Sequence, residues 1–423
     1  MLTLKAITED TYGVIRRLAK KNYNAKDIID QVIATDTKRK NAQTLLDANL
    51  AELNRLSKSI GQLMKEDKKE EAEVARNKVS LMKDGNKELE SEMKDAERVL
   101  IELLCQIPNL PSDEVPEGRT AEDNVVERKG GIIPELSQDA VPHWDLAKKY
   151  DLIDFETGVK IAGAGFPLYK GKGARLQRAL INFFLDSARE AGYLEVQPPY
   201  MVNAASGYGT GNLPDKEGQM YYCAIDDLYL IPTAEVPVTN IYRDTILEER
   251  DLPVKNTAYS ACFRREAGSY GKDVRGLNRL HQFDKVEIVR IDKPEHSYES
   301  LKEMVDYVQS LVEKLELPWR ILRLCGGDMS FTSALTFDFE VFSAAQQRWL
   351  EVSSVSNFES YQANRLKCRY KDENKKTQLC HTLNGSALAL PRIVAALLEN
   401  NQTPEGIRIP EVLVPYTGFE IIN

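Results

Sequence analysis

The chain has 423 residues, 29% of them charged, and a formal net charge of −9 at pH 7. This length allows a large buried core and predicts two or more domains. No apolar run approaches the ~18–20 residues of a membrane-spanning helix, which argues against a membrane protein. The acidic balance argues against a protein that coats DNA or RNA broadly, although it allows a local basic surface.

Targeting signals and cysteine spacing narrow the class further. The first ten residues carry acidic side chains and lack both an apolar signal region and an Arg/Ser-rich transit composition, so we expect a cytoplasmic protein. Six cysteines without a CxxC pair predict neither a disulfide framework nor a zinc site. We interpret the adjacent Cys380 and His381 as structural, because neighbouring side chains on a strand point to opposite faces.

Residues 28–63 and 72–103 each place mostly apolar side chains at alternating steps of four and three. Two such heptad runs, joined by the charged segment 65–71, predict an antiparallel coiled-coil hairpin, which we call the arm. At ~1.5 Å per residue the first helix would extend about 54 Å. We expect polar side chains on the seam to weaken it and to set its register. These are Thr35, Arg39, Asn49 and Asn86.

The residues of the arm do not identify its partner. A dimerisation coil or a spacer is the common role of such a hairpin. From Lys26 to Glu102 it carries 15 basic and 17 acidic side chains, so its overall charge does not indicate RNA. Local basic clusters at 38–40 and 65–69 could nevertheless contact backbone phosphates.

Three prolines between residues 108 and 118 predict a stiff linker, because proline stops helices and restricts the backbone. The linker divides the chain into an N-terminal domain, 1–107, and a second domain, 119–423. In the second domain, an amphipathic helix at 174–191 precedes a short strand that ends at Pro198.

The most informative stretch runs from Asn256 to Ile291. Two runs rich in β-branched and aromatic residues, 257–263 and 280–291, flank a loop that contains Gly268, Gly271 and Gly276, which predicts a strand–loop–strand unit. Arginines at the ends of paired strands suit a triphosphate, because a guanidinium group binds phosphate oxygens in pairs. A solvated hairpin loop is the alternative. The arginines are Arg264, Arg265, Arg275 and Arg279.

Three segments of the second domain resemble the signature motifs of the class II aminoacyl-tRNA synthetases. The helix–strand unit described above resembles the first motif, the run 263–266 (FRRE) the second, and 379–400 the third. Residues 268–287 are similar to the seryl-tRNA synthetase family in particular. The chain departs from that family at Arg265, where Ser or Lys is usual, and at Pro391, where Gly is usual.

The resemblance spans the whole chain and implies both a fold and an activity. The fold is α+β, with an N-terminal antiparallel coiled-coil hairpin followed by a class II catalytic domain whose mixed, mainly antiparallel sheet is flanked by helices. The activity is a ligase reaction. L-serine and ATP form seryl-adenylate, and the seryl group passes to the 3′-terminal ribose of tRNA(Ser), or of tRNA(Sec) where it is present. The resemblance further implies that Mg²⁺ accompanies ATP, that the arm contacts tRNA, and that the chain forms a homodimer.

The resemblance also implies which residues form the site. Arg264 and Arg392 would be catalytic, and Glu351 and Ser354 would bind Mg²⁺ together with the ATP phosphates. ATP would be bound by Arg264, Arg265, Glu266, Phe283, Glu351, Val352, Ser353, Ser354 and Arg392. Serine would be bound by Thr233, Ala234, Glu235, Arg264, Glu287 and Ser386.

Elementary chemistry agrees with the roles implied for the second motif. An arginine between a carboxylate and a phosphate lowers the cost of bringing two anions together, which suits Arg264. Glu266 would share a strand face with Arg264 if the strand pairing persists that far, and could accept a hydrogen bond from the adenine amino group. Phe283 could stack on adenine or could simply pack in the core.

Strand geometry makes two further expectations. Glu287 would lie inside a sheet, where a carboxylate needs a cation, and the ammonium group of serine would supply one. By strand alternation Glu351 and Ser353 share a face, whereas Ser354 joins Glu351 only if the strand bulges.

Two other functions are consistent with parts of the chain. An amino-acid:carrier-protein ligase would lack the arm and carry zinc ligands, and neither condition holds. A catalytically inactive paralogue, acting as an RNA-binding or scaffold protein, would keep the arm but would not need the charged residues retained here. These are Arg264, Glu266, Glu287, Glu351 and Arg392. No GxGxxG follows a strand, so a Rossmann fold is not expected.

Overall fold

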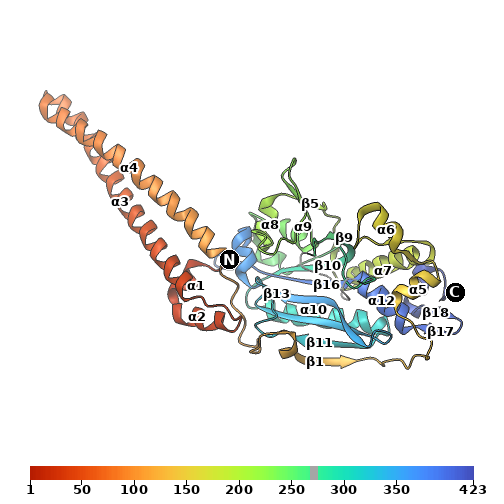
Figure 1. Ribbon diagram of the computed structural model, residues 1–423. Helices are drawn as coiled ribbons and strands as arrows, with labels where there is room; N and C mark the ends of the chain where they lie inside the picture. The colour runs from red at the N-terminus through yellow and green to blue at the C-terminus, as the bar shows by residue number, and fades with distance from the viewer. Residues whose placement is uncertain (267–274) are drawn as a thin grey trace. The chain divides into compact units, whose positions relative to one another are not determined.

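The structure is a computed structural model that describes residues 1–266 and 275–423 (Figure 1). Of the loop glycines noted above, Gly268 and Gly271 lie outside the described residues. The chain divides into two compact units, which we call the arm unit and the sheet unit. The arm unit comprises Leu2–Ala19 and Tyr23–Pro108, and the sheet unit comprises Met1, Lys20–Asn22 and Asn109–Asn423.

Two long helices lie side by side in the arm unit, as Figure 1 shows. The helices of this unit are α1 (Leu4–Glu9), α2 (Thr11–Ala19), α3 (Lys26–Lys65) and α4 (Lys69–Leu104). The predicted antiparallel coiled-coil hairpin is therefore confirmed. Two of the polar seam residues contact each other, since the Asn49 side-chain amide donates to the Asn86 side-chain oxygen at 2.9 Å.

The first third of α3 departs from the predicted heptad. Ile29 and Asp36 are buried there, and the predicted positions Ile28 and Thr35 are only half-buried. The buried Asp36 carboxylate accepts from Arg39 and pairs with Lys40, each at 2.8 Å. An aspartate had no place in an apolar repeat, but these two cations on the following turn allow it to be buried.

A large sheet forms the centre of the sheet unit. Within the described chain it has eight strands, in the order β1-β11-β12-β13-β16-β10-β9-β4. Every neighbouring pair is antiparallel except β4 and β9, so the predicted mixed, mainly antiparallel sheet is confirmed. The strands are β1 (Val125–Gly130), β11 (Trp319–Arg323), β12 (Leu335–Ser343), β13 (Arg348–Asn357), β16 (His381–Ala389), β10 (Gln282–Asp292), β9 (Val254–Phe263) and β4 (Leu194–Glu195).

Three amphipathic helices flank one face of this sheet. α7 (Gly171–Glu190), α10 (Ser297–Lys314) and α12 (Leu390–Asn400) bury apolar side chains in one continuous core with the strands. Val286 and Ile288 of β10 point into that core. Glu287, which lies between them on β10, therefore faces the other side of the sheet, because side chains alternate along a strand.

The remaining elements are short and surround the large sheet. The helices are α5 (His143–Lys149), α6 (Phe155–Ala162), α8 (Ala204–Thr210), α9 (Glu235–Asn240), α11 (Ser360–Leu366) and α13 (Val414–Thr417). Small sheets are formed by β2 (Ile153–Asp154) with β3 (Leu168–Tyr169), by β5 (Met201–Val202), β6 (Tyr222–Cys223) and β7 (Leu228–Leu230), by β8 (Ile246–Glu248), β14 (Arg369–Lys371) and β15 (Thr377–Leu379), and by β17 (Gln402–Thr403), β18 (Gly406–Arg408) and β19 (Ile421–Ile422).

The proline-rich segment after α4 is bound to the sheet unit along its first residues. The backbone N–H of Asn109 donates to the Phe331 carbonyl at 2.9 Å, and that of Ser112 donates to the Ala334 carbonyl at 2.8 Å. These bonds join the segment to the residues just before β12. In the described part of the chain, no helix combines the length and the apolar character needed to cross a membrane.

Candidate active site

The side of the sheet opposite the apolar core carries polar and charged side chains. Phe283, Lys285 and Glu287 alternate along β10 and share this face. Their partners across β9 are Cys262, Ser260 and Ala258. These three partners are small and fully buried, and Ala258 packs against Ala234 and Val238.

Lys285 and Glu287 form a buried ion pair at the centre of this face. Their side chains are only 8% and 1% exposed, and Lys285 Nζ lies 2.6 Å from Glu287 Oε2. The Thr233 hydroxyl donates to the same carboxylate oxygen at 3.1 Å. Burial raises the pKa of Glu287, although Lys285, Thr233 and Arg264 oppose the rise. The cation that we expected a substrate to supply is thus already present in the protein, two residues earlier on the same strand.

Glu235, at the start of α9, places a second carboxylate beside the first. Burial and the neighbouring Glu287 raise the pKa of Glu235 to about 7, against hydrogen bonds from Gln362 and Asn384. Gln362 Nε2 donates to Glu235 Oε1 at 2.6 Å, and the Thr382 hydroxyl donates to Gln362 Oε1 at 2.6 Å. Two carboxylates around one lysine leave this site with capacity for a further cation.

The sequence did not single out Gln362, Thr382 or Asn384. Gln362 comes from the short helix α11, which had no motif, whereas Thr382 and Asn384 lie on β16 within the third motif. Pairing of Asn384 with Val289 puts it on the Glu287 face, since directly opposite residues share a face. Asn384 could therefore be predicted from the sequence, because it lies two residues before the predicted serine-binding residue Ser386 and shares its strand face.

Ala234 contributes packing on this side of the sheet. Its methyl group is buried in an apolar cluster with Val238, Ala258 and Val289, which attaches α9 to β9 and β10. Thr233 keeps two roles, because its hydroxyl also accepts from the backbone N–H of Glu235 at 3.2 Å. Ser386 pairs with Glu287 across β10 and β16 and is also buried.

Arg264 lies at the edge of the charged cluster, just after β9 ends. Its guanidinium carbon lies 5.2 Å from the centroid of the Phe283 ring, and its Nε donates to the Pro232 carbonyl at 3.3 Å. The adjacent Arg265 is exposed, and its backbone N–H donates to the Gln219 carbonyl at 2.9 Å.

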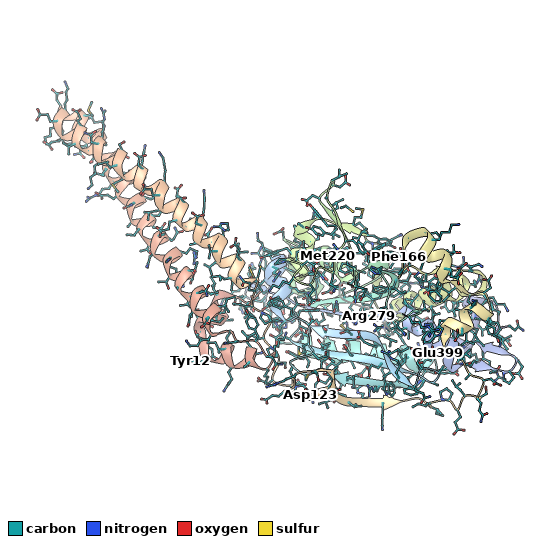
Figure 2. All side chains as sticks on the ribbon, viewed as in Figure 1. Tyr12, Asp123, Phe166, Met220, Arg279 and Glu399 are labelled. Carbon is teal, nitrogen blue, oxygen red and sulfur yellow. The ribbon has the colours of Figure 1, made fainter. Side chains whose placement is uncertain are left out.

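Glu266 does not continue the strand. β9 ends at Phe263, and Glu266 adopts a φ of 48°, so the alternation of strand faces no longer applies to it. Its carboxylate accepts a hydrogen bond from Arg279 Nη1 at 2.9 Å, and Figure 2 shows the position of Arg279 in the sheet unit. Glu266 and Arg279 therefore connect the two described ends of the loop.

Arg392, in the first turn of α12, lies beside β13. Its Nη1 donates to the Glu351 carbonyl at 2.7 Å and lies 3.7 Å from the Glu351 carboxylate, while its Nε donates to the Asn278 carbonyl at 3.2 Å. Pro391 also lies in this first turn, where the helix needs no N–H from it. The departure from the family pattern at Pro391 is thus compatible with an intact helix.

β13 contains the bulge on which the position of Ser354 depended. Glu340 pairs with Glu351 and Phe339 pairs with Ser353, so Val352 has no partner on β12. This extra residue puts Glu351 and Ser354 on the same polar face. Val352 is buried in the core, and the Ser353 hydroxyl donates to the Ser386 carbonyl at 2.6 Å.

Oxygen atoms suited to a hard divalent cation gather around Ser354. Ser354 is paired with Asp338 on β12, and one Asp338 oxygen, Oδ1, is buried without a hydrogen-bond partner. Burial, together with the nearby Glu351 charge, raises the pKa of Asp338 well above its usual value. Carboxylate and hydroxyl oxygens are the ligands that Mg²⁺ prefers, so this set fits it. In the described residues, no three His, Cys, Asp or Glu side chains are close enough to hold a metal by themselves.

Comparison with known proteins agrees with this fold. The family model described as the tRNA synthetase class II core domain (G, H, P, S and T) matches residues 221–401, and the seryl-tRNA synthetase N-terminal domain model matches residues 1–111. Residues 221–401, which include most strands of the large sheet, thus match the core of a class II aminoacyl-tRNA synthetase.

Full-length relatives specify the family. The chain is 53% identical to the serine–tRNA ligase of Salinibacter ruber, covering 100% of this chain and 99% of the relative, and 46% identical to that of Akkermansia muciniphila over the same shares. The crystal structure of seryl-tRNA synthetase from Pyrococcus horikoshii complexed with ATP superposes with a TM-score of 0.94 at 33% identity, covering 100% and 99% of the two chains. The chain belongs to the seryl-tRNA synthetase family and is a ligase.

These findings confirm the family inferred from the three motifs and the class of enzyme. The roles of individual site residues remain predictions, but the structure shows where these residues lie. Lys285, Glu235 and Glu287 form the buried charged centre, Arg264 lies at its edge, and Arg392 lies beside Glu351 of β13.

The ion pair on β10 leads to a test of stability. Replacing Lys285 with Met leaves the Glu287 carboxylate buried without its cation, so we expect the free energy of unfolding to fall by about 3–5 kcal/mol. The double variant Lys285→Met/Glu287→Leu removes both charges and should regain most of that loss. Urea denaturation at pH 7 measures both variants, and an equal loss in the single and double variants would contradict the pairing.

Proposed function

We propose that this chain activates L-serine with ATP to form seryl-adenylate and then transfers the seryl group to the 3′-terminal ribose of tRNA(Ser). The observation that carries the proposal is the pair of buried carboxylates, Glu235 and Glu287, on the same sheet face as Phe283 and beside Arg264. The same reaction with tRNA(Sec) is part of the proposal wherever that tRNA is present.

The site suits a small amino acid with two opposite charges. The α-ammonium group of serine would donate to Glu235 and Glu287, which share only one lysine between them. The serine carboxylate would face Arg264, which is close enough to Glu287 to lower its pKa. Polar groups for the serine hydroxyl are available on β16, where Ser386 pairs with Glu287. Thr233 orients the Glu287 carboxylate through its hydroxyl.

ATP would bind along the same face, between β9 and β13. The adenine ring would stack on Phe283, over which Arg264 lies, and its amino group would donate to Glu266. Arg264 and Arg392 would contact the phosphates, because each already has one edge of its guanidinium group held by a backbone carbonyl. The related Pyrococcus horikoshii enzyme was solved with ATP, which supports ATP as the nucleotide.

The reaction follows from placing two anions beside one arginine. A serine carboxylate oxygen attacks the α-phosphorus of ATP, a P–O bond forms in line with the P–O bond that breaks, and pyrophosphate leaves. Arg264 lowers the repulsion between carboxylate and phosphate and stabilises the charge of the transition state. In the second step a ribose hydroxyl of tRNA attacks the adenylate carbonyl, and AMP leaves.

Glu351 and Ser354 would hold a magnesium ion together with the ATP phosphates. The bulge at Val352 brings these two oxygen ligands to one face, and Asp338 lies below them with an unpartnered oxygen. The ion, when bound, neutralises phosphate charge. The backbone around Val352 and Ser353 would form the floor of this ATP subsite.

We assign tRNA binding to the N-terminal domain, residues 1–107, and both chemical steps to residues 119–423, with 108–118 between them. The family model for the seryl-tRNA synthetase N-terminal domain, matched at residues 1–111, supports this division. The arm would contact the tRNA outside its acceptor end. We place the enzyme in the cytoplasm, where its tRNA substrates are used.

A homodimer is also part of the proposal. α7 and β4 line an open groove of about 540 Å³ whose walls include Ile181, Leu185 and Val196. β4 is the terminal strand of the large sheet, and its Leu194 is 66% exposed. A second copy of the chain on this groove would cover apolar surface that water otherwise contacts.

Arg264→Ala tests the first chemical step. We expect serine-dependent exchange of pyrophosphate into ATP to fall by a factor of about 100 or more, because one preorganised charge is lost from the transition state. Exchange is measured with each amino acid in turn, and serine should be the one that supports it. Unchanged exchange in the variant would remove Arg264 from this role, and exchange with another amino acid would overturn the proposed substrate.

The raised pKa of Glu235 predicts a pH dependence of serine binding. Below its pKa of about 7 the carboxyl group becomes protonated and no longer attracts the α-ammonium group. Serine should therefore bind about ten-fold more weakly at pH 6 than at pH 8. Calorimetric titration measures this, and Glu235→Gln should bind serine weakly with no such dependence. Equal affinity of the unaltered chain at both values would contradict the role.

Deleting most of the arm separates the two steps. A variant that lacks Asp36–Glu92 should still form the adenylate, because the residues of the sheet unit are unchanged. It should lose charging of tRNA by a factor of about 100 or more, in keeping with the loss of several phosphate contacts. Exchange and aminoacylation assays on the same preparation compare the two, and normal charging would show that the arm does not read the tRNA.

A further inference from the structure

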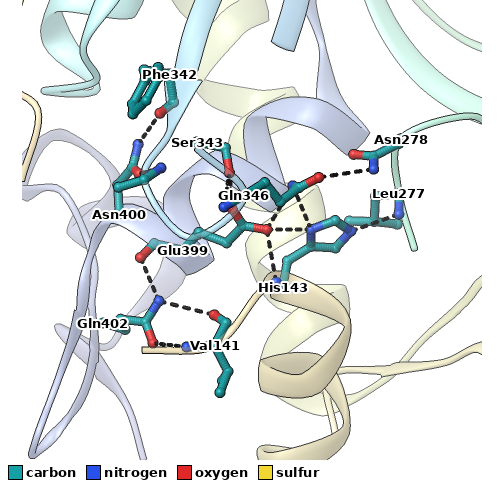
Figure 3. Close-up of polar contacts among 11 residues, drawn as sticks. Val141, His143, Leu277, Asn278, Phe342, Ser343, Gln346, Glu399, Asn400 and Gln402 are labelled. Atoms are coloured by element: carbon teal, nitrogen blue, oxygen red, sulfur yellow. Dashed lines mark hydrogen bonds and ion pairs between the residues drawn. The ribbon is translucent and has the colours of Figure 1, made fainter. Parts of the chain in front are cut away.

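His143, the first residue of α5, lies in a buried hydrogen-bond network outside the residues assigned above (Figure 3). Its side chain is fully buried, and its Nδ1 lies 2.6 Å from Oε1 of Glu399, which is also fully buried. The backbone N–H of His143 donates to the same oxygen at 2.9 Å. Glu399 thus fixes both the position and the ring orientation of His143.

The hydrogen bonds define the protonation state of the histidine ring. The backbone N–H of Leu277 donates to His143 Nε2 at 2.8 Å, so Nε2 carries no proton and Nδ1 must donate to Glu399. Burial would raise the pKa of Glu399, but hydrogen bonds from His143 and Ser343 outweigh it and lower the pKa below the usual value. A carboxylate that stays ionised keeps His143 in the tautomer that accepts from Leu277.

The same end of α5 contacts the returning end of the 264–279 loop at two further points. The Arg275 guanidinium carbon lies 4.5 Å from the centroid of the Trp144 ring. Gly276 has a φ of +66°, and a Cβ atom there would lie 2.2 Å from His143 Nε2, so only glycine fits. The chain from Arg275 to Leu277 is therefore packed directly on His143 and Trp144.

The network continues from this backbone to Arg392. The Asn278 side-chain amide donates to Gln346 Oε1 at 3.1 Å, and Gln346 Nε2 donates to Glu399 at 2.9 Å. The Asn278 carbonyl accepts from Arg392 Nε at 3.2 Å. Arg392 and Glu399 are seven residues apart on α12, which is about two turns, so they share a helix face. The hydrogen bonds close a ring that begins and ends on α12.

We propose that His143, held by Glu399, is a positioning residue for Arg392, acting through the Leu277–Asn278 backbone. This inference rests on the proposed function, because it assigns to Arg392 the ATP phosphates as its target. The imidazole of His143 accepts a hydrogen bond from the Leu277 N–H, which fixes the backbone of Leu277 and Asn278. The Asn278 carbonyl in turn accepts from Nε of Arg392. Nη1 of the same group donates to the Glu351 carbonyl at 2.7 Å, so two backbone carbonyls together fix the direction of the guanidinium group.

Two variants of His143 separate the hydrogen bond that its imidazole ring makes to Glu399 from the one that it accepts from Leu277. In His143→Asn the side-chain amide can take the place of Nδ1 and donate to Glu399, but it does not reach Leu277. In His143→Gln the side-chain oxygen reaches the place of Nε2 and can accept from Leu277. We expect His143→Asn to raise the KM for ATP about ten-fold, as one buried N–H loses its partner, with the KM for serine within two-fold. His143→Gln should retain most of the affinity for ATP.

The measurement is serine-dependent pyrophosphate exchange by the full chain, with ATP and serine varied separately. If His143 only supports the fold, both variants should lower the unfolding temperature and kcat together and leave the KM for ATP unchanged, which would overturn the inference. As a second readout, His143→Asn should raise the KM for ATP no further in an Arg392→Ala background, because the two changes act on one contact. Additive effects would also overturn it.

The outcomes distinguish this inference from the function on which it rests. Absence of exchange in the unaltered chain would overturn the proposed function and this inference with it. Normal exchange in the unaltered chain, with an unchanged KM for ATP in His143→Asn, would overturn the inference alone.

Discussion

The site depends on ionised side chains being buried on one face of a sheet, where each needs a partner. Lys285 lies against Glu287, and Glu235 lies close to both. An unpaired charge in such a place costs several kcal/mol, so neighbouring elements must supply polar groups. Thr233 does so from the segment before α9, and Gln362 does so from α11. The demand for partners thus brings short segments, distant in the chain, to a single place on the sheet.

The two arginines at the edges of the site are held in a different way. Arg264 donates to the carbonyl of Pro232, and Arg392 donates to those of Asn278 and Glu351. A carbonyl group has no net charge, so it orients a guanidinium group without neutralising it. Arg264 is therefore fixed in direction while much of its charge remains available to an incoming phosphate or carboxylate, which is the arrangement that electrostatic catalysis requires. The Glu351 carboxylate, 3.7 Å from Nη1 of Arg392, balances part of the charge of Arg392.

The heptad periodicity of the sequence predicted the coiled-coil hairpin, and the resemblance of three ordered motifs to the class II synthetases implied the mainly antiparallel sheet. Features set by contacts between segments escaped prediction. Lys285 was overlooked as the partner of Glu287, although the spacing of two already placed both on one strand face. Glu266 could share a strand face with Arg264 only if strand pairing continued past the predicted run, and β9 ends at Phe263. Gln362 lay in a helix without any motif, so nothing in one sequence pointed to it.

The extra residue in β13 has a consequence for how this protein can change. Val352 shifts the alternation of side chains, so that Glu351 and Ser354 emerge on the same side of the strand. Loss of a single residue here would restore regular pairing and turn one of these groups inward. The strand would keep nearly all of its residues, but Glu351 and Ser354 would no longer lie on the same face. Insertions and deletions in β13 should therefore be tolerated far less than substitutions in the same strand. They should also be tolerated far less than insertions and deletions in a surface loop.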